Sequence, residues 1–259
     1  MTVTTAGVRP PQVSRARPLL ALTRAETRLF LRDPLTTLLG VLLPAAVLVG
    51  LGAVPALREP SEVFGGLRFT EYFAPSLLAI SIAVLGVQNL PTGLATYREK
   101  GILRRLSATP VSPFAVLVVQ LLLNLVTVAL GTVLMVAVAV LVFDVPAPRH
   151  PFGFALAFLC GTGAVFAIGL LIAALAPRAK VATGIGTVVF LVTQFFAGVY
   201  LPKFLLPDVV VRIGEFVPPG IGAFQGSWTG AGADPVQLAV MALIAVVATA
   251  TAARFFRWE

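Results

Sequence analysis

The sequence has little of the chemistry that enzymes use. It contains one cysteine, Cys160, and one histidine, His150, so it offers no internal disulfide and no cluster of these side chains for metal binding or nucleophilic catalysis. Each lysine follows Glu99, Ala179 or Pro202, so the Gly-Lys-Ser/Thr sequence that cradles nucleotide phosphates is missing. We therefore expect no catalytic residue, no metal and no bound cofactor on this chain.

Charge is also scarce. Charged residues make up 12% of the chain and hydrophobic residues 58%, whereas soluble domains carry about 25% charged residues. Apolar runs long enough to cross a hydrocarbon core of roughly 30 Å, about 20 residues each, recur along the chain without any Asp, Glu, Lys, Arg or His. The sequence therefore predicts an all-α integral membrane protein with six transmembrane helices, at 35–57, 73–96, 114–143, 152–176, 181–201 and 236–253.

The segment before the first span is basic and proline-containing, which predicts a cytosolic tail over its first part. Leu19, Leu22, Leu29 and Phe30 then recur at roughly helical spacing, with arginines on another side. This pattern predicts an amphipathic helix over 18–32 that lies at the cytoplasmic interface, with an ordinary solvated helix as the alternative. We divide the chain into this tail and helix, 1–34, and a permease domain, 35–259.

The positions of Lys and Arg predict the orientation. Connections on one side of the predicted membrane hold only five of the 19 basic residues, Arg58, Arg68, Arg149, Lys203 and Arg212. The other side holds the rest, together with both termini. Because cytoplasmic connections carry the excess of Lys and Arg, both termini and the loop between spans two and three are predicted to be cytoplasmic. The net charge of +8 is thus explained by topology and does not indicate nucleic-acid binding.

That loop, Tyr97 to Pro113, concentrates charge, glycine and helix punctuation. If it is helical, Ile102, Leu103 and Leu106 share a sector of about 100°, and the basic pair Arg104 and Arg105 points away. Gly101 permits a bend after the preceding helix, and Pro110 prevents the short helix of the loop from continuing into the next span. The pattern favours a short amphipathic helix that faces a partner at the membrane surface.

Several polar residues lie inside the predicted spans, and they need partners or water there. Either helix packing or a solute path accounts for them. The outer connection 202–235 mixes apolar and charged residues, which allows a short interfacial or re-entrant helix or a plain loop. The polar residues in question are Gln88, Asn89, Gln120, Asn124, Thr127, Thr193 and Gln194.

The run from Tyr97 to Pro113 resembles the membrane subunit of ABC-2 type exporters, in the daunorubicin-resistance-like permease group. It has that family's Glu, Lys-Gly, Leu, basic pair and Thr-Pro in order, at Glu99, Lys100, Leu103, Arg104 and Thr109 onward. The six-span layout with an N-terminal interface helix extends the resemblance over nearly the whole chain. In the outer segment after span five, the run Val217 to Ile221 replaces the family's Asn-Pro-Leu-type sequence.

The resemblance implies that the loop is a coupling helix docked on a separate ABC ATP-binding subunit, which would bind ATP and Mg. Its apolar residues would then sit in a groove of that subunit while its charged residues set the register. The second inner loop, 177–180, is expected to make a smaller contact. The implied coupling residues are Arg98, Glu99, Lys100, Gly101, Ile102, Leu103, Arg104, Arg105 and Leu106.

The resemblance also implies that spans two and five line a translocation path between two permease copies, in a bacterial cell membrane. Because those positions carry no charge, we expect an amphiphilic, drug-like or lipid-like solute; whether the permease pairs with itself or with a related chain stays open. An ATP-independent secondary transporter and a membrane-embedded enzyme are the alternatives, but the spans lack the titratable groups either would need. The implied path residues are Gln88, Asn89, Thr193, Gln194, Phe195 and Phe196.

Overall fold

The computed structural model describes residues 16–32, 38–102, 105, 113–200 and 205–255, and within them the regular elements are helices. Two segments are π-helical, η1 and η4, and two are short 3₁₀ turns, η2 (Pro55–Leu57) and η3 (Glu62–Phe64). The all-helical prediction is confirmed for the described residues. The main helices are α1 (Ala16–Leu31), α3 (Leu43–Gly52), α4 (Phe69–Ala83), α5 (Leu90–Glu99), α7 (Pro113–Phe143), α8 (Pro151–Leu175), α9 (Ala179–Phe196), α10 (Asp208–Gly214), α11 (Ile221–Thr229) and α12 (Pro235–Phe255).

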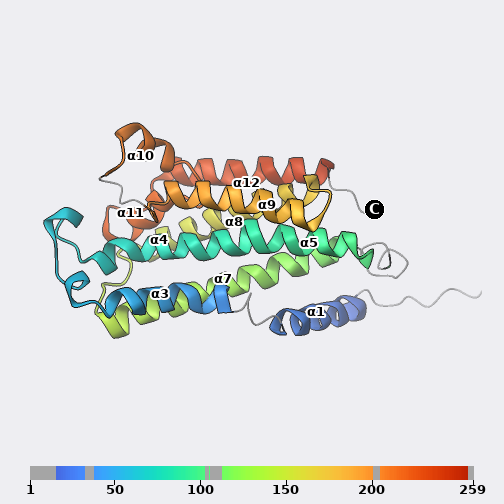
Figure 1. Ribbon diagram of the computed structural model, residues 1–259, viewed down its shortest axis with the longest axis horizontal. Coiled ribbons are helices and arrows are strands. Elements are labelled where there is room, and N and C mark those ends of the chain that lie inside the picture. Colours follow the sequence, from blue (N-terminus) through green and yellow to red (C-terminus); the bar gives the residue numbers. More distant parts are fainter. Residues whose placement is uncertain (1–15, 33–37, 103–104, 106–112, 201–204, 256–259) are drawn as a thin grey trace, which may run out of the picture.

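The long helices run side by side in one elongated bundle (Figure 1). The continuous α4–η4–α5 helix passes through its middle, α3 packs on α7 along one side, and α8 packs on α12 on the other. α1 lies at the end of the bundle where α5 ends, and α10 and α11 lie at the opposite end. The end that carries α1 is the predicted cytoplasmic end.

Five helices of the described residues are long and apolar enough to cross a membrane. They correspond to predicted spans two to six, and their ends lie within a few residues of the predicted ones. The helix of span two runs from Phe69 to Glu99 and so extends past both ends of the predicted 73–96, and that of span five ends at Phe196 instead of the predicted 201. These five helices define a multi-pass membrane protein, whereas the number six stays a prediction.

The predicted first span, 35–57, is interrupted. Its described part begins with the π-helix η1 (Leu38–Leu42), continues as α3 and ends at Gly52, so its apolar helix Gly40–Gly52 is shorter than the other five. Pro44 explains the wide turn: it has no N–H to bond the carbonyl of Gly40, and Ser81 Oγ donates a hydrogen bond to that oxygen at 3.1 Å. The irregularity ahead of this proline thus takes the form of a π-helical segment.

A second π-helical segment, η4 (Val84–Asn89), precedes Pro91 in the middle helix. The backbone of this segment lies against two neighbouring helices at glycines. A Cβ atom built at Gly169 of α8 would lie 1.9 Å from the carbonyl oxygen of Gly86, and one at Gly186 of α9 would lie 2.1 Å from that of Val87. Small residues are therefore required where α8 and α9 meet the centre of the bundle.

The outer connection contains two short helices, in agreement with the helical alternative for 202–235. α10 is largely exposed, whereas α11 is inserted against α4 and α8 with Phe224 and Trp228 fully buried. Trp228 Nε1 donates to the carbonyl oxygen of Pro146 at 3.0 Å, and Phe154 of α8 meets the rings of Phe224 and Trp228 edge-on, each with centroids 5.6 Å apart. α11 is therefore a buried helix that closes this end of the bundle.

We predict that Gly169→Ala destabilises the protein by about 1–3 kcal/mol, because the added methyl group meets backbone that cannot move aside. Gly163→Ala on the same helix is the matched control, since its Cβ would lie 3.9 Å from Ala245, an ordinary contact. Thermal unfolding in mild detergent should show a lower midpoint for the first variant only. Equal midpoints for the two variants would contradict the close approach of α8 to η4.

Candidate functional site

A buried carboxyl group joins α1 to the end of α5 and to the first turns of α7. Glu26 of α1 is only 5% exposed, and its Oε2 accepts hydrogen bonds from the hydroxyl of Tyr97 at 2.8 Å and from Nε2 of Gln120 at 2.6 Å. Gln120 Nε2 also lies 3.4 Å from the Tyr97 hydroxyl. We call Glu26, Tyr97 and Gln120 the polar triad. Through it, the N-terminal helix is attached to the two helices that flank the 97–113 loop.

The triad continues into the bundle as a chain of amides. Asn124, one turn further along α7, donates from Nδ2 to the carbonyl oxygen of Gln120 at 2.8 Å. Its Oδ1 accepts from Nδ2 of Asn89 on η4 at 3.4 Å. Polar side chains inside a membrane need such partners, so Asn89 and Asn124 satisfy each other between α7 and the middle helix. For these residues the structure supports helix packing.

The last residues of α5 contact the connection between α8 and α9. Arg98 donates from Nη1 to the carbonyl oxygen of Ala173 at 3.3 Å and from Nη2 to that of Ala176, and Glu99 Oε2 accepts from the backbone N–H of Ala179 at 3.3 Å. The guanidinium group of Arg98 thus contacts the C-terminus of α8, and the carboxylate of Glu99 contacts the N-terminus of α9. Both contacts have the sign that helix dipoles favour.

The predicted coupling residues divide into two groups. Arg98 and Glu99 make the contacts within the chain described above, whereas Lys100 and Arg105 are exposed and Ile102 is half-buried. Gly101 has a φ of 65°, a left-handed conformation that glycine adopts freely, and it provides the predicted bend after α5. Leu103, Arg104 and Leu106 lie outside the described residues. The docking role of the whole set stays a prediction.

The predicted path residues do not share one open surface within the protomer. Thr193 is 5% exposed and Gln194 is fully buried, where its Nε2 donates to the carbonyl oxygen of Ala79 at 3.3 Å. Gln88 and Asn89 are half-buried, and so are Phe195 and Phe196, whose rings pack edge-on with centroids 5.5 Å apart. Their contact with a solute stays a prediction.

A different set of residues forms the uncovered face of spans two and five, and sequence reasoning missed it. Thr183, Gly184 and Thr187 of α9 are exposed, and a Cβ atom at Gly184 or at Gly93 of α5 would meet nothing within 4 Å. Thr183 Oγ1 lies 3.1 Å from Thr92 Oγ1 of α5. We call these five residues the small-residue face. The spacing of Thr183, Gly184 and Thr187 at i, i+1 and i+4 was the sequence signal that could have indicated this face.

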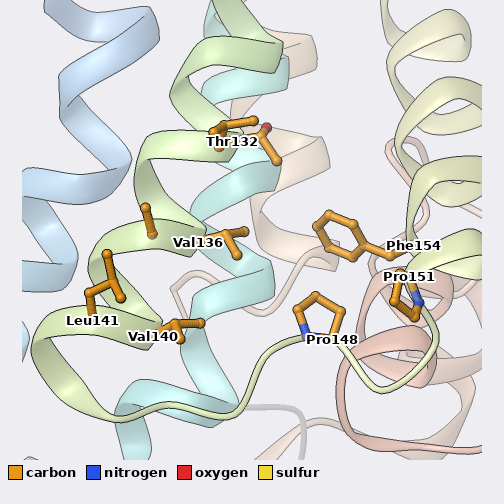
Figure 2. Close-up of a pocket in the computed structure, with 9 residues that line it drawn as sticks. Thr132, Val136, Val140, Leu141, Pro148, Pro151 and Phe154 are labelled. Atoms are coloured by element: carbon orange, nitrogen blue, oxygen red, sulfur yellow. The ribbon is translucent and has the colours of Figure 1, made fainter.

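Two cavities lie in the half of the bundle that holds α11. The larger, of about 480 Å³, lies between α7 and the start of α8 and is almost entirely apolar (Figure 2). The smaller, of about 250 Å³, lies between the start of α4 and α11 and is lined in part by Glu71, Tyr72 and Gln225. Among the described residues no group of three His, Cys, Asp or Glu side chains could hold a metal ion.

The fold defines a multi-pass, all-helical membrane protein over the described residues. The chain belongs to the ABC-2 type transporter family, because the family model matches residues 17–219. Comparison with curated proteins and with solved structures gave no match. The matched region runs from α1 to the segment before α11, so it includes the polar triad, the 97–113 loop and the small-residue face. Family membership indicates a transport subunit that pairs, in general, with a separate ATP-binding subunit.

Sequence reasoning missed Glu26 because it treated the N-terminal helix as a leucine face and an arginine face. In the structure Leu20 and Leu29 are exposed, as are Arg24 and Arg28, and the side that meets the bundle carries Glu26. A single carboxyl group among arginines was the available signal. A carboxylate at this position indicates a hydrogen-bond acceptor for donors on a neighbouring helix.

We predict that Glu26→Ala loosens α1, because two buried donors lose their acceptor at a cost of about 1–3 kcal/mol each. Hydrogen exchange of the backbone amides of 16–31 should become faster than in the parent protein. Tyr97→Phe removes one donor and should have a smaller effect, and the exposed Arg28→Gln should have none. Unchanged exchange in Glu26→Ala would exclude the triad as the attachment of α1.

Proposed function

We propose that this chain is the permease half of an ATP-driven exporter of the daunorubicin-resistance-like group. Two copies would enclose the path at the small-residue face, and the 97–113 loop would dock on the ATP-binding subunits. The observation that carries the proposal is the pair of contacts from Arg98 and Glu99 to the connection between α8 and α9. A force applied at the loop would reach these two helix ends directly.

The mechanism follows from where the contacts lie. Closure of the ATP-binding subunits on ATP would move the loop at the end of α5. Arg98 and Glu99 would then carry α8 and α9 with α5, and the polar triad would carry α1 and α7. Because all these contacts lie at one end of the bundle, they favour a rigid-body tilt of the helices that alternates access to the path.

The composition of the small-residue face supports a second copy as its partner. Threonine and glycine in a membrane helix permit close helix approach, and the open space at Gly93 and Gly184 leaves room for a second helix. The threonines of α9 already bond to their own helix: Thr187 Oγ1 donates to the carbonyl oxygen of Thr183 at 2.9 Å. The small-residue face is thus suited to packing against another helix without charged contacts.

The nature of the face also bears on the solute. The described, exposed part of α9 beyond Lys180 carries no charged side chain. A path between two such faces would favour an amphiphilic, drug-like or lipid-like solute over a small ion. Rotation of the helices would bring Gln88, Asn89, Phe195 and Phe196, which are half-buried in the protomer, toward this path.

The first test is association with the ATP-binding subunit. The tagged parent protein, purified from its native membranes in mild detergent, should bring down an ATP-binding subunit, and Leu103→Asp should lose it by placing a charge in an apolar groove. Val209→Asp, at an exposed position of α10 at the other end of the bundle, is the matched control and should retain it. Loss in both variants, or in neither, would contradict docking through the loop.

The second test addresses the pairing and the transmission. In a Cys160→Ala background, Thr187→Cys should crosslink to itself in a second copy, whereas Leu243→Cys, which is exposed near the middle of α12, should not. Addition of ATP to the complex should change the crosslinking yield of the Thr187→Cys variant. The Arg98→Gln substitution should abolish that change, although the variant still binds the ATP-binding subunit. Crosslinking from Leu243→Cys alone would place the pairing on another face.

A further inference from the structure

The larger cavity has the form of a slot in the outer half of the bundle. Its α7 side is formed by Thr132, Val136, Val140 and Leu141, and Phe154 of α8 and Pro148 of the connection face them across it (Figure 2). Among these residues Thr132, at the deep end, supplies the one polar side chain. Its volume of about 480 Å³ lies in the range of about 300–1,000 Å³ typical of ligand pockets.

The slot has the length of one membrane leaflet. Nine residues separate Thr132 from Leu141 along α7, which at a rise of 1.5 Å per residue is about 14 Å. Half of a hydrocarbon core of roughly 30 Å is about the same length. Because α7 ends at Phe143, the slot runs from the membrane surface toward the middle of the bilayer. Leu141 is 81% exposed and Val133 is 66% exposed, so the slot borders lipid.

An arginine stands in the chain next to the surface end of the slot. Arg149 and His150 stand in the chain between Pro148 and Pro151, which both line the slot, and both are exposed. Their backbone N–H groups donate to the carbonyl oxygens of Trp228 and Ser227, at 3.2 and 3.0 Å, which holds this part of the connection on α11. Asp144, the carboxylate of the same connection, is at its other end, next to α7.

We propose that the slot between α7 and α8 binds one acyl chain of a membrane phospholipid whose phosphate meets Arg149. An apolar slot with the depth of one leaflet and an arginine at its mouth matches the two parts of such a lipid, because guanidinium groups bind phosphate through charge-assisted hydrogen bonds. The site is separate from the small-residue face on α5 and α9. A lipid held here fills the space beside Phe154 and so supports the buried helix α11, whose Phe224 and Trp228 pack on the same ring.

Trp228 provides the readout. Its side chain is only 1% exposed, so bulk lipid does not reach it, but its ring centroid lies 5.6 Å from that of Phe154, which lines the slot. Trp258→Phe leaves Trp228 as the only tryptophan of the chain. In mixed micelles, phosphatidylcholine brominated on one acyl chain should quench its fluorescence, and the quenching should saturate at a low mole fraction of that lipid.

Two pairs of variants test the two parts of the site. Ala137→Phe fills the slot and should abolish most of the quenching, whereas Ala129→Phe, on the same helix outside the slot, should leave it unchanged. Arg149→Gln should raise the half-saturating mole fraction roughly threefold to tenfold, through loss of a charge-assisted hydrogen bond to phosphate. Arg212→Gln, exposed on α10, should leave it unchanged.

Three results would overturn the proposal. Absent quenching would mean that no acyl chain enters the slot. Quenching that rises linearly with mole fraction and survives Ala137→Phe would mean only bulk lipid contact. The third result is saturable quenching by a brominated fatty acid at the same half-saturating mole fraction as the phospholipid, with no change in Arg149→Gln. It would mean that the occupant is another amphiphile. Each variant is compared only if it elutes as the parent does in size-exclusion chromatography.

Discussion

The structure depends on one constraint: backbone groups in a membrane core must be satisfied by protein, because no water is available there. Pro44 and Pro91 each interrupt a helix in that core, and a π-helical segment precedes each of them. At the first, Ser81 supplies the missing donor to the carbonyl oxygen of Gly40. At the second, glycines of α8 and α9 bring their backbones close to the segment. The second segment thereby determines how closely α8 and α9 approach the middle helix, and the first is joined to that helix through Ser81.

At the end of the bundle that carries α1, side chains supply the hydrogen-bond partners. Glu26 accepts the hydrogen bonds of Tyr97 and Gln120, and the neighbouring residues Arg98 and Glu99 meet the ends of α8 and α9. Three consecutive residues of α5 therefore contact three different parts of the chain. This concentration of contacts explains how one short loop could move several helices together. It also means that the charges of this segment serve the permease itself as well as any partner.

Much of the fold could be predicted from the sequence, because a membrane span is defined by length and lack of charge, both of which are local. The five long helices lie close to the predicted spans for this reason. The first span was harder: its helix ends at Gly52, where Phe143 of α7 lies 2.2 Å from the position that a Cβ atom would take, a contact that the local sequence does not reveal. The site was predicted only in part: the 97–113 loop was found from its motif, but the contact of Arg98 with α8 depends on residues 75 or more positions away.

By itself, the sequence determined the class of the protein, its helical content and its family, since apolar length, charge distribution and an ordered motif can be read without coordinates. The tertiary structure decided which polar residues face each other and which faces remain open. Gln194, a predicted path residue, is buried in this structure and bonds to the carbonyl oxygen of Ala79, whereas Thr187, which the sequence did not single out, is exposed. The physical reason is that every side of a helix packs against some environment, which the sequence of the helix alone does not identify. Only the positions of the neighbouring helices decide whether a given side meets protein, lipid or a second chain.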